Sequence, residues 1–162
     1  MSNPRTAHTR DVTWRLATFA ALSTAELYEL MRLRQLVFVV EQACAYLDAD
    51  GRDPEALHLL GWRVVDGERR ELLACARLFA PGTKHAEAVI GRVVTHPAVR
   101  GQGLGRELML EAIAAVERSF ATTTIRLSAQ RYLEQFYASL GFVAEGEPYD
   151  EDGIPHIEMV RR

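Results

Sequence analysis

The chain has little cysteine and no long apolar run. Its two cysteines, Cys44 and Cys75, are too few for a disulfide framework and do not have the spacing of a zinc motif. No apolar stretch approaches the roughly 20 residues that cross a bilayer. The first ten residues are polar, and no apolar signal segment follows them. These absences favour a cytoplasmic protein with free thiols, no bound metal and no membrane segment.

Positive charge is not in excess either. The chain has 19 lysines and arginines against 22 acidic residues, a net charge of −3. A general nucleic-acid binder needs a basic surface, so a nucleic-acid partner is not expected. The 162 residues, 48% of them hydrophobic and 25% charged, have the composition of an ordinary globular domain. We expect one domain over residues 12–162 after a flexible tail at 1–11.

Hydrophobic periodicity and turn residues divide the chain into alternating elements. Strands are predicted at 12–19, 58–65, 72–79, 87–95, 125–129, 142–147 and 154–160. Helices are predicted from the Ser23–Glu26 capping box to about Val40, from Arg106 to Arg118, and from about Tyr132 to Gly141. This order predicts an α/β domain whose mixed, mostly antiparallel sheet has one central parallel strand pair and flanking helices.

A glycine-rich turn lies between the fourth predicted strand and the second helix. It reads Arg100-Gly101-Gln102-Gly103-Leu104-Gly105. A helix begins with unpaired N–H groups and partial positive charge, and glycines let a phosphate approach the backbone closely. The turn therefore predicts a site for a phosphate-bearing cofactor, the alternative being a tight turn without a ligand.

Two common phosphate motifs are absent. The dinucleotide fingerprint requires a third glycine where this chain has Arg106, and no acidic residue ends the strand at 125–129 to hold a ribose. No Gly-Lys-Ser/Thr sequence occurs, so the Walker pattern fails as well. These failures disfavour a nicotinamide dinucleotide and ATP.

The pattern that fits is Arg-x-x-Gly-x-Gly, formed by Arg100, Gly103 and Gly105. It resembles the pyrophosphate loop of the GNAT N-acetyltransferase superfamily. The order of elements and the later sequence Phe136-Tyr137-x-x-x-Gly141-Phe142 strengthen that resemblance, which spans about residues 12–161. Three further stretches, at 34–42, 58–62 and 149–157, are similar to ElaA-like bacterial members.

The resemblance implies a GNAT fold over residues 12–162. It also implies transfer of the acetyl group of acetyl-coenzyme A to a primary amine, on a small molecule or a peptide, by direct attack. Members of the superfamily often form homodimers. The cofactor would contact the backbone of Val93, Val94 and Thr95 and the loop residues Arg100, Gly101, Gln102, Gly103, Leu104, Gly105 and Arg106. A coenzyme A-binding sensor without turnover is the alternative.

Two catalytic residues are expected. The resemblance implies that Tyr137 protonates the departing thiolate, although the tyrosine also lies on an apolar stripe and is compatible with packing. Glu41 is the candidate base. It follows Arg34 by seven residues on the core-facing stripe of the first helix, so this charged pair is either a buried structural pair or part of the site.

Two histidines and an acidic loop are further candidates. His58 and His156 each begin a predicted strand and would face a cleft as substrate-binding or basic residues, or else be structural. Asp48, Asp50 and Asp53 match a calcium loop only loosely. We interpret them as a solvated turn. The alternative is that these aspartates, together with Asp150, Glu151 and Asp152, give the mouth of the site a negative field that attracts a cationic amine.

Overall fold

A computed structural model of the chain describes residues 11–162, so nearly all of the predicted tail lies outside the described residues. Seven strands form one sheet in the order β1-β2-β3-β4-β5-β7-β6. The strands are β1 Val12–Thr18, β2 Leu57–Val65, β3 Arg69–Phe79, β4 Ala88–Thr95, β5 Ile125–Gln130, β6 Val143–Glu151 and β7 Ile154–Arg161. Every neighbouring pair is antiparallel except β4 and β5. The predicted fold class is confirmed.

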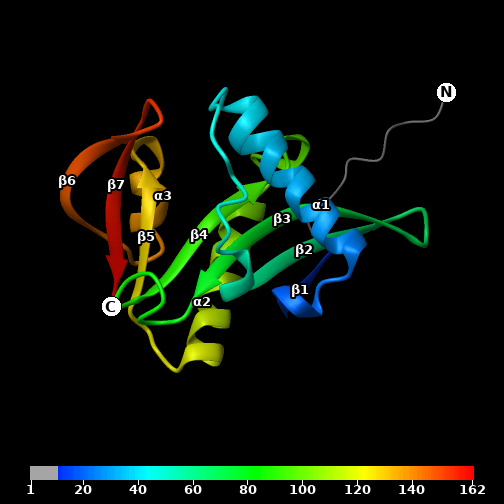
Figure 1. The fold of residues 1–162 in the computed structure, drawn as a ribbon, viewed down its shortest axis with the longest axis horizontal. Helices are drawn as coiled ribbons and strands as arrows, with labels where there is room; N and C mark the ends of the chain where they lie inside the picture. The colour runs from blue at the N-terminus through cyan, green and yellow to red at the C-terminus, as the bar shows by residue number, and fades with distance from the viewer. Residues whose placement is uncertain (1–10) are drawn as a thin grey trace.

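The helices cover both faces of this sheet. They are α1 Thr24–Arg34, α2 Leu104–Phe120 and α3 Glu134–Ala138, and α1 lies on the opposite face from α2 (Figure 1). The predicted capping box opens α1, because the Ser23 side chain accepts from the Glu26 N–H and the Glu26 side chain accepts from the Ser23 N–H. No helix within residues 11–162 is long and apolar enough to cross a membrane.

Side chains of β3 alternate between two apolar clusters. Leu73 packs in the cluster that contains α2, whereas Leu72 and Cys75 pack in the one that contains α1. The middle of the sheet is therefore buried on both faces, which explains why its strands are apolar runs. The clusters hold β4 firmly between two helices.

The parallel pair is short. β4 and β5 pair only at Ala88–Ile125 and Val89–Arg126. Further along β4, Arg92 has φ of +49°, and the register against β3 shifts, as at a β-bulge. On its other side β5 pairs with β7 over its whole length, 125–130. The sheet therefore opens between β4 and β5, toward the glycine turn that follows β4.

Candidate active site

A cleft of about 800 Å³ lies where β4 and β5 separate. One wall is β4 from Val89 to Thr95, and the other includes Leu127, Ser128 and Gln130 of β5. Most of the predicted site residues line it: Glu41, Val93, Val94, Thr95, Arg100, Gly101, Gly103, Gly105, Arg106, Tyr137 and His156.

The glycine turn has the backbone geometry of an anion cradle. Gly101 and Gly103 have φ of +75° and +88°, and a Cβ built at either would meet no atom within 4 Å. Arg106 donates the first intrahelical bond, to the Gly103 carbonyl at 3.1 Å. The N–H groups of Leu104 and Gly105 therefore have no acceptor within the helix. Open space and unpaired donors fit a phosphate at this turn.

Two members of the predicted loop differ from the rest. The side chain of Leu104 is buried in the α2 cluster, so only its backbone is available to a ligand. Gln102 does not line the cleft.

Arg106 reaches across to α3, where it donates to Ser139 Oγ at 3.0 Å. This contact ties the start of α2 to the helix that holds Tyr137.

Glu41 lies in the cleft but does not contact Arg34. Its carboxylate accepts from Arg100 Nη1 at 2.7 Å, and the two side chains are 38% and 42% exposed. The predicted Arg34–Glu41 pair is wrong because α1 does not continue as an α-helix. Residues Gln35–Glu41 form a π-helical turn, which changes the angle between successive side chains and rotates Glu41 off the buried stripe.

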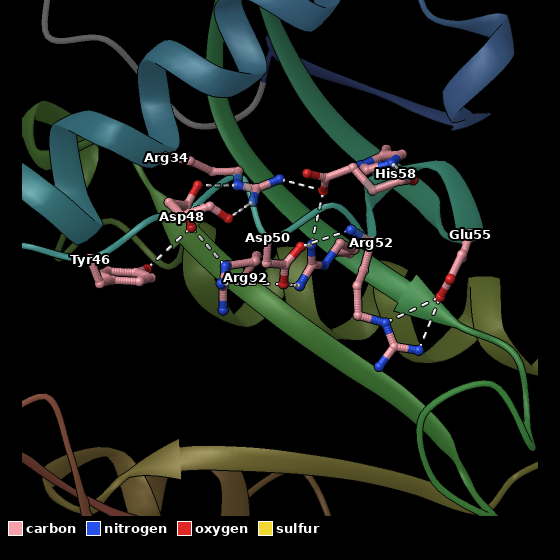
Figure 2. A network of polar contacts seen from close by, with 10 residues as sticks. Arg34, Tyr46, Asp48, Asp50, Arg52, Glu55, His58 and Arg92 are labelled. Atoms are coloured by element: carbon pink, nitrogen blue, oxygen red, sulfur yellow. Dashed lines mark hydrogen bonds and ion pairs between the residues drawn. The ribbon is translucent and has the colours of Figure 1, made fainter.

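Arg34 instead belongs to a buried ionic network (Figure 2). Its Nε donates to Asp48 Oδ2 at 2.7 Å and its Nη1 to Asp53 Oδ1 at 2.6 Å. Arg77 of β3 pairs with Asp50 and Asp53, and Arg92 of β4 pairs with Asp48 at 2.7 Å. Three arginines thus neutralise three aspartates.

The interpretation of this acidic loop as a solvated turn is wrong. Asp48 and Asp53 are 4% and 6% exposed because the arginines allow their burial. Burial opposes the ionisation of Asp53, but hydrogen bonds from Arg34 and Arg77 outweigh it and lower the pKa of Asp53. The signal in the sequence is that Arg77 and Arg92 interrupt otherwise apolar strands.

His58 does not face the cleft. It is 1% exposed, and its Nε2 donates to the Asp53 carbonyl at 2.9 Å. Burial lowers the pKa of His58, so the ring is held neutral. Its contacts make it a structural histidine beside the network, and the expectation of a substrate contact is not met.

Tyr137 enters the cleft from α3. Its ring packs against Phe136 and Phe142 with centroids 5.1 and 6.1 Å away. The residue is only 6% exposed, and burial raises its pKa to about 12. Among residues 11–162 the hydroxyl has no hydrogen-bond partner. Tyr137 thus keeps its hydroxyl proton at neutral pH and lines the cleft.

Several residues that line the cleft were not predicted from the sequence. Ser128, Tyr149 and Glu158 lie beside His156, and their hydroxyl and carboxylate groups are linked by hydrogen bonds. Cys44 also lines the cleft, whereas Cys75 is buried elsewhere and burial raises its pKa to about 12. These residues come from different strands, so no local motif marks them. In the described part of the chain, no cluster of three or more His, Cys, Asp or Glu is arranged to hold a metal.

Known proteins are similar to this chain in both sequence and fold. Residues 76–162 match a family model described as an acetyltransferase (GNAT) domain. ElaA of Escherichia coli is 40% identical over 152 residues, which cover 93% of this chain and 96% of ElaA. The chain belongs to the GNAT acetyltransferase family. It is an ElaA-like member. A UPF0039 protein of Synechocystis is 43% identical, over 94% of this chain and 96% of the Synechocystis protein.

Solved structures agree with this assignment. The crystal structure of an acyl-CoA N-acyltransferase from Pseudomonas aeruginosa has 47% sequence identity to this chain and a TM-score of 0.86. The match covers 93% of this chain and 99% of the acyltransferase chain. The crystal structure of E. coli ElaA is 38% identical with a TM-score of 0.84, over the same shares. Membership of this GNAT family supports acyl transfer from an acyl-coenzyme A as the general reaction.

Proposed function

We propose that this GNAT protein is an acetyl-coenzyme A-dependent N-acetyltransferase acting on a primary amine of a small molecule or peptide. One observation carries the proposal. The separation of β4 and β5 brings the open glycine turn and the free hydroxyl of Tyr137 into a single cleft. A phosphate site and a proton donor are thereby joined by a channel between two strands. We also propose that residues 12–162 form one catalytic domain, because a single sheet runs through them.

In this proposal the phosphates of acetyl-coenzyme A bind the turn at 101–105. The backbone N–H groups and the helix dipole attract them, and Arg100 and Arg106 add charge. The pantetheine arm lies along Val93–Thr95, where β4 has no paired strand on the cleft side. An N–H of the same segment stabilises the negative charge that develops on the thioester oxygen.

Tyr137 acts as the general acid. Its raised pKa, about 12, keeps the hydroxyl protonated at neutral pH. The departing sulfur then takes the proton as the carbon–sulfur bond breaks. Because Tyr137 sits in an apolar ring cluster, its position is fixed by packing.

Two titratable residues in the cleft are candidates for the base. Glu41 would take a proton from the acceptor through a water molecule, or hold its ammonium group directly. Its carboxylate is already paired with Arg100, which also donates to the Thr95 carbonyl at 3.4 Å. His156, which also lines the cleft, is the other candidate.

The test is release of free thiol from acetyl-coenzyme A in the presence of a panel of primary amines. The panel contains polyamines, amino acids, aminoglycosides and peptides with a free N-terminus or lysine, and mass spectrometry identifies the products. We expect amine-dependent thiol release and a product heavier by one acetyl group. Binding of acetyl-coenzyme A without thiol release for any amine would contradict the proposal and favour the sensor.

A further inference from the structure

The cleft passes through the sheet and so opens on both faces. On β5, Leu127 and Ala129 point toward the α2 face, where they share a cluster with Tyr137. Ser128 and Gln130 alternate with them and point to the α1 face. Gln130 confirms this direction, because its Nε2 donates to Gln42 Oε1 at 3.3 Å, just after the π-helical turn.

A polar cluster occupies the α1 face of the β5-β7-β6 arm. Ser128 pairs in register with Glu158, Gln130 with His156, and His156 in turn with Tyr149. Partners in register share a face of the sheet. All five side chains line the cleft, on the face away from Tyr137.

The hydrogen bonds of this cluster have a fixed direction. Tyr149 donates its proton to Glu158 Oε1 at 2.9 Å. Ser128 therefore donates to the Tyr149 hydroxyl, and the serine keeps its lone pairs to accept from another donor in the cleft. Burial raises the pKa of Tyr149 to about 12, so this tyrosine stays a neutral donor and is not a base.

The His156 ring is held in one orientation. Its Nδ1 lies 2.7 Å from the Ile154 carbonyl, which can only accept, so Nδ1 carries the hydrogen. In the neutral ring, Nε2 then carries the lone pair. The ring stacks on Tyr149, with centroids 6.0 Å apart and planes 26° apart, and the side chain is 12% exposed. Glu151 Oε2 lies 4.0 Å from Nε2.

Two carboxylates that line the cleft are already paired with donors. Glu41 accepts from Arg100 at 2.7 Å. Glu158 accepts from Tyr149 at 2.9 Å and lies 3.5 Å from Arg126. In each of these two side chains a carboxylate oxygen therefore already accepts from a neighbouring donor. Nε2 of His156 has no such donor among the described residues.

We propose that His156 is the general base of the transfer and acts from the opposite face of the sheet to Tyr137. This inference rests on the proposed function. An acceptor that binds as an ammonium ion loses one proton to Nε2, which passes it to solvent. The lone pair of the acceptor's nitrogen then forms the bond to the thioester carbon while the carbon–sulfur bond breaks. Sulfur takes the Tyr137 proton, and the nitrogen's second proton returns through solvent to the tyrosinate.

The test compares a protonated acceptor with a neutral one. Near neutral pH butylamine is almost wholly an ammonium ion, whereas hydroxylamine is unprotonated and needs no initial deprotonation. For His156→Gln we expect kcat with butylamine to fall on the order of a hundredfold, as for loss of a general base. The loss with hydroxylamine should be much smaller. His85→Gln, an exposed loop histidine outside the cleft, is the matched control and should change neither rate.

Three results would overturn the inference. Equal losses with both acceptors would mean that His156 only shapes the site, and no loss would mean that it plays no part. A selective loss for butylamine in Glu41→Gln but not in His156→Gln would assign the base to Glu41. A wild-type chain that releases no thiol with these acceptors or with the amine panel would instead contradict the proposed function itself.

Discussion

At the scale of single residues, the ring and the hydroxyl of Tyr137 have separate roles, the ring in packing and the hydroxyl in the proposed chemistry. Its ring fills an apolar site between Phe136 and Phe142, while its hydroxyl points to the cleft with no partner in the described chain. Removing the hydroxyl leaves almost all of the packing in place. The two contributions are therefore separable by one substitution.

We predict that Tyr137→Phe lowers kcat on the order of a hundredfold, the contribution of one general acid. The stabilisation of the protein by acetyl-coenzyme A should hardly change, because the ring and its contacts remain. Steady-state kinetics and thermal unfolding of the same preparation measure the two effects. Tyr28→Phe, on the exposed side of α1, is the control and should leave kcat unchanged. An unaltered rate in Tyr137→Phe would remove its acid role.

Residues that belong to local motifs were predictable, and residues whose partners lie far along the chain were not. The glycine turn and Tyr137 are marked by short patterns, and the structure places both in the cleft. The partner of Glu41 is Arg100, which is 59 positions away, and no spacing rule points to it. His58 is the second residue of β2, one position from its predicted place at the start of the strand, but only the folded loop shows that its ring is buried against the Asp53 carbonyl.

At the scale of elements, the segment between α1 and β2 is held by charge. Asp48, Asp50 and Asp53 all lie in this segment, and they bind arginines of α1, β3 and β4. Arg92 joins the network to the bulge of β4, where it also covers the rings of Phe38 and Tyr46. The network therefore fixes one wall of the cleft as well as the fold.

We predict that Asp53→Asn lowers the free energy of unfolding by about 3–5 kcal/mol, because the three arginines of the network would keep only two carboxylates, which leaves one buried positive charge uncompensated. Urea unfolding measures the change. Glu55→Gln is the matched control from the same segment. Its carboxylate is 51% exposed and pairs with Arg52 at the surface, so its loss should cost at most about 1 kcal/mol. Similar costs for the two variants would contradict the ionic account of this segment.

The same network predicts a pH dependence. The folded pKa values of Asp50 and Asp53 are lowered by their arginine partners against the cost of burial. Their stabilisation is therefore fully present above the ordinary carboxyl pKa of about 4, and it is lost as the pH falls through the lowered folded values. Repeating the urea series at acidic pH should show a shallower loss of stability in Asp53→Asn than in the wild type.

Element boundaries followed from the sequence where a local signal sets them. The Ser23 capping box and the turn at Asp152-Gly153 are of this kind, and both are present. The change from α- to π-helix after Arg34 has no such signal. Residues 35–41 are mostly β-branched or aromatic, and their geometry depends on contacts with the sheet and with the buried network.

At the scale of the whole molecule, the sheet consists of two arms. β1-β2-β3-β4 and β5-β7-β6 join directly through only two paired positions. Figure 1 shows the second arm standing apart from β4, with α2 and α3 behind. This opening is what allows a ligand to lie between central strands. The order of the strands along the chain and the parallel pair were predictable from the sequence. The place of β7 between β5 and β6 was not predicted. Nor was the length of the β4–β5 pairing, because it depends on the bulge at Arg92 and on packing from both faces.

A cofactor that binds across both arms should stabilise the whole domain. Ligand at about one hundred times its dissociation constant adds roughly 2.7 kcal/mol to the free energy of unfolding. For a chain of this length that corresponds to a rise in Tm of about 5–10 °C. NAD shares the phosphates but should have no effect, since the dinucleotide fingerprint is absent.

Two variants of the turn sharpen this experiment. Gly103→Glu would place a carboxylate where the phosphate binds, and Gly103→Ala adds only a methyl group. Both force a non-glycine residue to φ of +88°, and neither Cβ meets another atom within 4 Å. Backbone strain should therefore lower the Tm of both variants equally without ligand, and only the glutamate should abolish the response to acetyl-coenzyme A.

The measurement to make first is therefore thermal unfolding of the wild type and of these variants, with and without acetyl-coenzyme A. We predict a rise of several degrees for the wild type with acetyl-coenzyme A, none with NAD, and none for Gly103→Glu. No rise for the wild type, or an equal rise in Gly103→Glu, would mean that the turn between β4 and α2 does not hold the cofactor, and the proposed acetyl transfer would be contradicted.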